Sequence, residues 1–457
     1  MQDRRVQSPT EVNYELLEPV IYRTPRMVWV LMAALGLGLL TGLLTFGLVL
    51  IYGWGLGGQN RPIMWGILIA NFVFWIGISH AGVMISAILR LTQAEWRRPV
   101  TRAAEVLTAF ALATAALQPV LHAGRPWRIL YWVFPYDFFR GIWPNVRSPL
   151  VWDPSAIFTY LTGTILFVYV AMIPDLAIMR DRSTGWQRAF YGAMALGWRG
   201  NPRQWRLQGV VGILLSALML PVFVSVHSIV SWDFAVSLVP IWHATVFAPY
   251  FVIGAVHSGV SSVATLMALM RWIFKWENHI RPEHFDALGR LLVAVASAWM
   301  FYFLLDVFFA IYSGEPAELA VMERRFFEWP FNVMLAVIFI FGYFVPIPLW
   351  LSGRVRRNIP LMFVTSLLVN IAMWMERYWL VIPGLELKER LAYNYVTYTP
   401  SVTEIVIVVA SFAQVGLLVL LFAKLFPLIP VWEAKEGQVL AAEIQIGKRK
   451  VPALIKE

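Results

Sequence analysis

The sequence predicts an all-α, polytopic membrane protein with about ten transmembrane helices. Hydrophobic residues make up 59% of the 457 residues and charged residues only 14%, whereas a soluble domain carries roughly 25% charged residues. Apolar stretches of about 20 residues or more have the length that a helix needs to cross a bilayer. Ten such stretches are present: 27–51, 63–89, 103–122, 155–179, 207–231, 237–270, 288–312, 329–351, 359–382 and 401–427.

The basic residues predict the orientation of these spans. An even number of spans places both termini on one side, and that side receives 27 of the 37 Lys and Arg residues, against 10 on the other side. Because positive loops stay in the cytoplasm, we expect both termini to be cytoplasmic and the chain to lie in the inner membrane. The net charge of +10 then reflects topology, not a nucleic-acid partner. One outer loop departs from the rule by holding Arg125, Arg128, Arg140 and Arg147.

Two motifs recur at nearly the same spacing. The segment around His80 recurs around His257, 177 residues later, and a motif containing Pro174 recurs at Pro348, 174 residues later. A shared offset indicates duplication of a four-helix unit, and four helices give a parallel repeat. We therefore expect a cytoplasmic N-terminal segment (1–26), a peripheral helix with an outer loop (27–62), two four-helix bundles (63–236 and 237–382), an outer loop with a peripheral last helix (383–427) and a cytoplasmic tail (428–457).

Three ionisable residues are predicted at the outer ends of spans. His122 ends the third span, Asp153 precedes the fourth, and Asp233 lies in the short outer turn after the fifth. Oxidation of a quinol releases two electrons and two protons, and His and Asp side chains are suited to accept those protons. We therefore expect a quinol site on the outer side of the membrane. Its candidate residues are His122, Arg125, Trp127, Asp153, Asp233 and His243.

Each of the three also has a structural explanation. His122 fits a cap on the last carbonyls of its helix. Asp153, followed by Pro154, fits a helix N-cap, and Asp233 fits a turn. These explanations stay open for each residue alone, and the convergence of all three at one end favours the functional interpretation.

A second set of ionisable residues lies deeper in the spans and is a candidate proton path. Buried charge is costly in a membrane, so such residues are functional candidates. The structural explanation is that the histidines pack in the core and that Glu376 and Arg377 form an internal ion pair. The set comprises His80, Glu105, Asp175, His257, Asp306, Glu376 and Arg377.

The absence of cysteine limits the redox chemistry of the chain. Thiolate-bound iron–sulfur clusters, covalently attached haem and cysteine-bound zinc are excluded. A b-type cytochrome stays open as a rival function, because His243 and His257 are 14 residues apart, which is close to four helical turns. A proton-coupled secondary transporter and a purely structural anchor subunit also stay open.

The segment His122-Ala-Gly-Arg-Pro-Trp-Arg128 resembles the His-x-Gly-Arg-Pro signature of the NrfD/polysulfide-reductase membrane-subunit family. Ten spans and a leader containing Leu17-Glu-Pro-Val20 resemble, within that family, the larger quinol-oxidising subunit of alternative complex III. The resemblance implies a menaquinol site on the periplasmic side, lined by His122, Asp153 and Asp233. It also implies a membrane subunit without haem, iron–sulfur cluster or metal of its own. Its partners would be an iron–sulfur protein, a multihaem cytochrome c and a second NrfD-like subunit.

Overall fold

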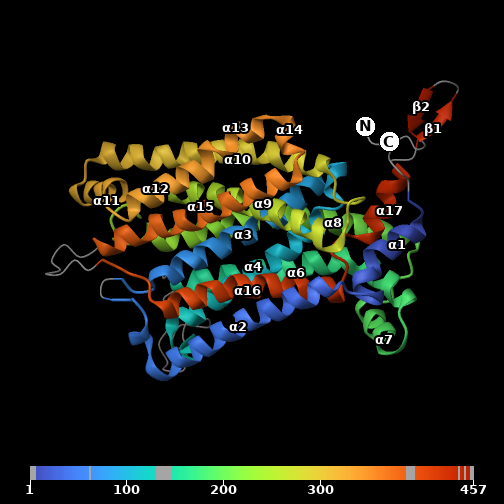
Figure 1. Ribbon diagram of the computed structural model, residues 1–457, viewed down its shortest axis with the longest axis horizontal. Helices are drawn as coiled ribbons and strands as arrows, with labels where there is room; N and C mark the ends of the chain where they lie inside the picture. The colour runs from blue at the N-terminus through green and yellow to red at the C-terminus, as the bar shows by residue number, and fades with distance from the viewer. Residues whose placement is uncertain are drawn as a thin grey trace.

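The long helices of the protein run side by side along its longest axis in the computed structural model (Figure 1). The structure describes residues 7–60, 63–129, 147, 149–387, 397–440, 443–446 and 449–452. Within these residues, ten helical spans are long and apolar enough to cross a membrane, which confirms the predicted fold class. Helices α1 and α17 lie together at one end, which we call the terminal end (Figure 1). We call the opposite end the distal end.

The transmembrane helices are α2 (Arg26–Tyr52), α3 (Gly66–Leu91), α4 (Thr101–Ala123), α6 (Pro149–Arg182), α8 (Pro202–Ala235), α9 (Phe247–Phe274), α10 (Pro282–Ser313), α12 (Phe331–Phe339) with η6 (Ile340–Phe344) and α13 (Pro346–Leu351), α15 (Ile359–Glu386) and α16 (Val402–Leu425). The remaining elements are shorter: α1 (Pro9–Leu17), η1 (Glu18–Tyr22), η2 (Trp54–Leu56), η3 (Glu95–Arg97), η4 (Pro126–Ile129), α7 (Gly185–Met194), α11 (Pro316–Phe327), α14 (Gly353–Arg356), α17 (Val431–Leu440) and the antiparallel strands β1 (Glu443–Ile446) and β2 (Arg449–Pro452).

Helix α3 lies at the centre of the molecule and α2 at its edge. In the apolar window of α3, 94% of the residues are buried, against 11% in α2. Helix α3 packs against α4, α8, α9 and α15, whereas α2 packs mainly on α16. A Cβ atom added at Gly42 of α2 would lie 2.1 Å from the Cβ of Ala410. Small residues thus permit close helix contact in α2, while its leucine-rich remainder stays exposed.

Eight spans form two groups of four that meet along α3 and α9. The first bundle comprises α3, α4, α6 and α8, and the second comprises α9, α10, α12–α13 and α15. A Cβ atom added at Gly259 would lie 2.1 Å from the Cβ of Ala81. The two copies of the repeated motif, around His80 and His257, therefore contact each other, and their small residues allow the close approach of the helices.

Three helix boundaries differ from the sequence prediction. Helix α6 begins at Pro149, so Asp153 lies inside the helix and is not its N-cap. The helix continues through Pro154 and loses one backbone hydrogen bond there. Helix α8 continues to Ala235, which places Asp233 in its last turn instead of in a connecting turn.

The third difference concerns the span predicted at 237–270. Helix α9 begins only at Phe247, because Pro240 lacks a backbone N–H and Ile241 has a φ of 69°. His243 therefore precedes the helix, and its 14-residue spacing from His257 is not a helical spacing. This removes the geometric support for a haem held by that pair. The span predicted at 329–351 is helical, but it widens into the π-helix η6 before Pro346.

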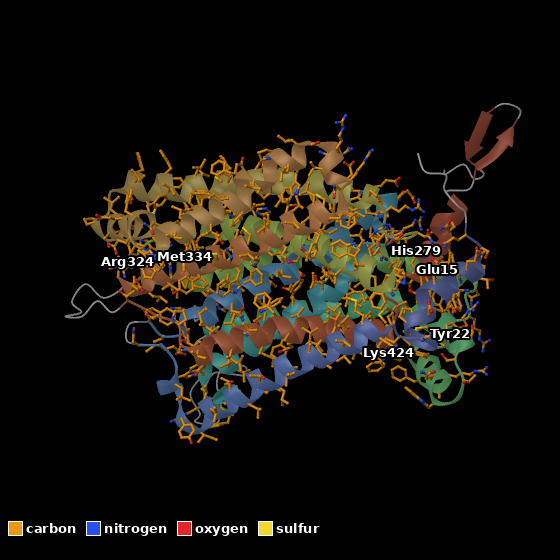
Figure 2. The ribbon with its side chains drawn as sticks, viewed as in Figure 1. Glu15, Tyr22, His279, Arg324, Met334 and Lys424 are labelled. Carbon is orange, nitrogen blue, oxygen red and sulfur yellow. The ribbon has the colours of Figure 1, made fainter. Side chains whose placement is uncertain are left out.

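Side-chain contacts of glutamates in α1 and α17 hold these two helices against the bundles at the terminal end. Glu433 of α17 lies 2.9 Å from Arg97 and 3.6 Å from Arg90, measured between side-chain nitrogen and oxygen atoms. In α1, Oε2 of Glu15 lies 3.0 Å from Nε2 of His279, and both residues are labelled in Figure 2. The two chain segments outside the spans thus share one end of the molecule.

Candidate functional site

His122 lies in the last turn of α4, at the distal end. Gly124 ends this helix with a φ of 61°, a conformation that glycine adopts without strain. A Cβ atom at Gly124 would also lie 2.5 Å from the indole ring of Trp54. Both the backbone conformation and the close indole ring therefore favour glycine at this position of the sequence signature. The His122 ring meets Phe72 edge to face, with centroids 6.2 Å apart, and hydrogen-bonds to the backbone of Leu68.

Asp153 and Asp233 lie in the distal turns of α6 and α8, two helices that pack against each other. Each helix therefore places one carboxyl group near the distal end, where it could accept a proton or donate one.

The three predicted residues share one feature. Each has a buried polar atom with no hydrogen-bond partner among the described residues: Nε2 of His122, Oδ1 of Asp153 and Oδ1 of Asp233. Buried polar groups are normally satisfied, and an unpaired one costs about 1–3 kcal/mol. Three such atoms lie at the distal ends of three helices of one bundle, and each is able to form a hydrogen bond with a ligand.

The other predicted quinol-site residues lie differently. Arg125 and Trp127 follow α4, and both side chains are exposed. His243 contacts Glu315 and Glu318 near the distal end of α10, so its part in quinol binding stays a prediction. Within the predicted arginine loop, Arg147 is exposed, whereas Arg140 and the side chain of Arg128 lie outside the described residues.

A row of aromatic and titratable residues crosses the middle of the two bundles. The ring of His80 stacks on Tyr160, with centroids 4.8 Å apart, and meets His227 of α8 at 4.6 Å. His257 of α9 lies beside Trp299, at 5.8 Å. In the described structure neither ring nitrogen of His257 has a hydrogen-bond partner, and Nε2 of His80 has none either.

The acids of the second bundle are held by cations and a tyrosine. Arg377 pairs with Glu376 at 3.2 Å, which is the ion pair considered from the sequence, and the Tyr250 hydroxyl donates to Glu376 at 2.6 Å. Asp306 lies 3.8 Å from Arg325. The two arginines also cover aromatic rings, Arg377 over Phe251 at 4.9 Å and Arg325 over Trp379 at 4.8 Å.

The remaining two candidate path residues lie near the terminal end of the first bundle. Glu105 accepts a hydrogen bond from Ser86. Asp175 pairs with Arg102 at 3.0 Å and accepts from the backbone N–H of Trp432 at 3.0 Å. Across the described ranges, no hydrogen bond joins this pair of acids to the row in the middle of the bundles.

Sequence reasoning missed three members of these groups. His227 was a single histidine in an apolar span, and only the fold shows that it faces His80. Tyr250 is one of 16 tyrosines and carries no signal of its own. Arg325 lies in a connection, in α11, and returns to the core to meet Asp306. The available sequence signal was an acid in an apolar span with no Lys or Arg within 15 residues of it.

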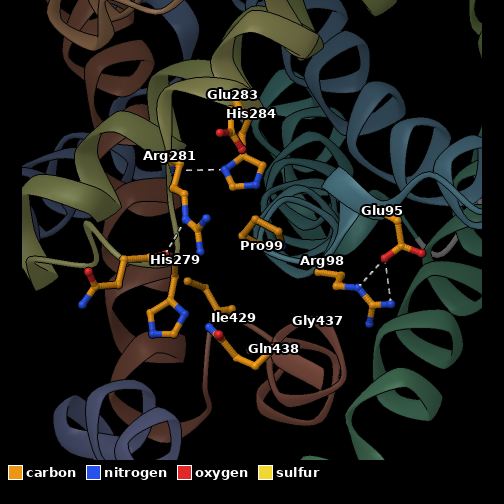
Figure 3. Close-up of a pocket in the computed structure, with 12 residues that line it drawn as sticks. Glu95, Arg98, Pro99, His279, Arg281, Glu283, His284, Ile429, Gly437 and Gln438 are labelled. Carbon is orange, nitrogen blue, oxygen red and sulfur yellow. Dashed lines mark hydrogen bonds and ion pairs between the residues drawn. The ribbon is translucent and has the colours of Figure 1, made fainter. Parts of the chain in front are cut away.

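A separate polar cavity of about 80 Å³ lies at the terminal end (Figure 3). It is lined by charged residues, but Arg98 already pairs with Glu95 at 3.0 Å and with Glu436. His279 and Arg281 line the same cavity. Because this region also joins α17 to the first bundle, we interpret the cavity as part of the terminal packing.

Comparison with known proteins places the chain in a family. The pattern of the family described as "Polysulphide reductase, NrfD" matches residues 55–387. A putative dimethyl sulfoxide reductase membrane subunit of Halobacterium salinarum is 24% identical over 213 residues, which are 46% of this chain and 45% of that protein. An Hdr-like menaquinol oxidoreductase integral membrane subunit of Archaeoglobus fulgidus is 21% identical over 418 residues, which are 86% of this chain and 92% of that protein. The family match covers more than half of the chain, so this multi-pass membrane protein belongs to the NrfD family.

Proposed function

We propose that this chain is the quinol-binding membrane subunit of a larger oxidoreductase complex, and that it oxidises menaquinol at the distal end. The observation that carries the proposal is the set of three buried atoms on His122, Asp153 and Asp233 that have no hydrogen-bond partner among the described residues. A quinol has two hydroxyl groups, and both must lose a proton as the ring is oxidised. The site supplies acceptors of the required chemistry at the ends of three packed helices.

The proton steps divide between the two kinds of side chain. Nε2 of His122 accepts one proton, and the Asp153–Asp233 pair accepts the other. The two electrons pass to a partner protein, because this chain has no cysteine for an iron–sulfur cluster. The proposed partners are an iron–sulfur protein, a multihaem cytochrome c and a second NrfD-like subunit. Two similarities support a quinol oxidoreductase: the family match and the similarity to a menaquinol oxidoreductase subunit.

The orientation of the proposal follows from the loop charges. The terminal end carries most of the Lys and Arg residues, so we assign it to the cytoplasm and the distal end to the periplasm of the inner membrane. Quinol oxidation at the distal end would then release protons outside. This arrangement is alternative complex III-like.

Proton translocation through the bundles is the finer part of the proposal. It is supported by the row of titratable residues that contains His80, His257, Asp306, Glu376 and Arg377, together with Glu105 and Asp175 near the terminal end. The rings of His80 and His227 contact each other, with centroids 4.6 Å apart. Buried ionisable groups of this kind mark proton relays in membrane proteins.

The test uses the complex purified with this chain and reconstituted in vesicles containing a pH-sensitive dye. With a short-chain menaquinol as the probe, we expect His122→Ala and Asp153→Asn to lower quinol oxidation by about 10²–10⁴-fold, with the complex still assembled. Asp181→Asn is the matched control, because Asp181 lies on the same helix but is exposed at the terminal end. Unchanged turnover in both site variants would overturn the site, and the dye reports whether protons also leave the inner compartment.

A further inference from the structure

His243 belongs to a second cluster at the distal end, in the second bundle. Its Nε2 atom lies 3.2 Å from Oε1 of Glu318 and 3.7 Å from Oε2 of Glu315. One ligand atom from each of the three residues lies within 4.8 Å of the other two. The two glutamates are three residues apart at the start of α11, so one helical turn presents both carboxylates to the histidine.

The hydrogen bonds of His243 define which ring nitrogen is available. Nδ1 lies 3.1 Å from the backbone carbonyl oxygen of Val239, so it carries a hydrogen and donates to that oxygen. Metal-binding histidines commonly donate their other ring N–H to a backbone carbonyl in this way. In the neutral ring, Nε2 then presents a lone pair toward two carboxylate groups. A divalent cation between them would bind all three groups, whereas a protonated ring would pair with the carboxylates.

A second observation points into the same place from inside the protein. His243, Glu318 and Asp306 line one cavity of about 230 Å³. Asp306 is only 4% exposed, and its Oδ1 atom has no hydrogen-bond partner among the described residues. A buried carboxylate oxygen facing this cavity would accept a hydrogen bond from a water molecule bound to a cation.

The geometry points to a divalent transition-metal site, of the kind that takes Zn²⁺, formed by His243, Glu315 and Glu318. Zinc binds imidazole nitrogen and carboxylate oxygen at about 2.0–2.2 Å, which places neighbouring tetrahedral ligands about 3.3–3.6 Å apart. The distances of 3.2 and 3.7 Å from His243 to the two carboxylates are close to this range. Asp306 would orient a metal-bound water in the fourth position.

The metal site uses other elements than the three proton-accepting residues of the proposed quinol site, which lie at the distal ends of α4, α6 and α8; His243 is the one residue predicted for both. The acids and the histidine come from the segment before α9 and from the start of α11, and Asp306 comes from α10. The inference therefore does not depend on quinol oxidation.

The experiment measures Zn²⁺ binding to the purified full-length protein after treatment with a chelator. By equilibrium dialysis with elemental analysis, we expect one Zn²⁺ per chain, with affinity lowered at least about tenfold by His243→Ala and by Glu318→Gln. Asp306→Asn should lower it by about 10–100-fold, as is typical for a residue that orients a ligand of the metal. X-ray absorption should show one imidazole ligand at about 2.0–2.1 Å.

His279→Ala is the matched control. His279 also contacts a glutamate, Glu15 at 3.0 Å, but at the terminal end and with a single carboxylate; this variant should bind zinc like the parent protein. Equal zinc content in the parent protein and in His243→Ala would overturn the inference, as would no zinc bound at micromolar concentrations. In the second case the cluster is an imidazolium paired with two glutamates.

Discussion

The two bundles have related frameworks but hold their ionisable groups in different ways. At the distal end of the first bundle, Asp153 and Asp233 have no ion-pair partner among the described residues. In the second bundle, each buried acid has an arginine beside it, Arg325 at Asp306 and Arg377 at Glu376. Removing one partner of a buried ion pair leaves an uncompensated charge and is costly, whereas an acid without a cation beside it has no such dependence. The two bundles therefore differ in how strongly their acids depend on a neighbouring arginine.

The repeated histidines show the same divergence. His80 lies between Tyr160 and His227, so three groups that can carry or orient protons are in contact. His257 occupies the matching position in α9 but lies beside Trp299. The motif that the two copies share is thus the close contact between α3 and α9, made by the small residues around both histidines.

The largest expected effect comes from replacing Arg325, the cation beside Asp306 in the second bundle. Arg325→Ala leaves Asp306 buried without its partner, and we expect a loss of about 3–5 kcal/mol of stability, measured by thermal unfolding in detergent. Asp153→Asn in the first bundle should leave stability nearly unchanged, because no cation is paired with Asp153 among the described residues.

The control for Arg325 lies on the acid's own helix. Arg290 pairs with Asp286 of α10 at 2.8 Å, but the arginine side chain is 66% exposed, so Arg290→Ala should cost no more than about 1 kcal/mol. If Arg325→Ala were as mild as Arg290→Ala, the second bundle would not depend on its buried ion pair.

The contact between the bundles gives a smaller expected effect. Gly259→Leu would place side-chain atoms where Ala81 lies, since even a Cβ atom there would be 2.1 Å from the Cβ of Ala81. We expect a loss of about 1–3 kcal/mol, read from the same unfolding measurement. Gly47→Leu is the control, because nothing lies within 4 Å of a Cβ atom at Gly47. Equal melting temperatures for the two variants would contradict the close contact between α3 and α9.

The sequence was sufficient for the ten helices, because they depend on local pattern, while the duplication stays a prediction from the recurring motifs. Apolar length alone locates ten spans, and the recurrence of His80 at His257 indicates the duplication. The boundaries at Asp153 and Asp233 were wrong because proline and short polar connections are strong local signals, and here helix packing overrides them. The start of α9 was wrong for the opposite reason: the apolar segment before it is packed, but Pro240 prevents it from being helical.

The partners of the buried residues could not be predicted, because they come from distant parts of the chain. Arg325 reaches Asp306 from a connecting helix, and Glu318 reaches His243 across 75 positions of sequence. His122, Asp153 and Asp233 were predicted as a group because their spans end on the same side of the membrane, and their role in a quinol site stays a prediction. Their lack of partners among the described residues, which carries the proposed function, is a property of the fold.

The smallest expected effect is at the terminal end, where Glu15 contacts His279 outside the membrane spans. The hydrogen bond from His279 lowers the pKa of Glu15 below its ordinary value of 4.5. A carboxyl group with a lowered pKa stabilises the fold above its unfolded-state pKa, and this contribution is lost as the pH falls through the folded-state pKa. Because Glu15 is partly exposed, we expect Glu15→Gln to cost only about 0.5 kcal/mol at about pH 6. The difference in melting temperature between Glu15→Gln and the parent protein should shrink toward zero below about pH 4. A difference that is the same at both pH values would show that the glutamate acts through packing and not through its charge.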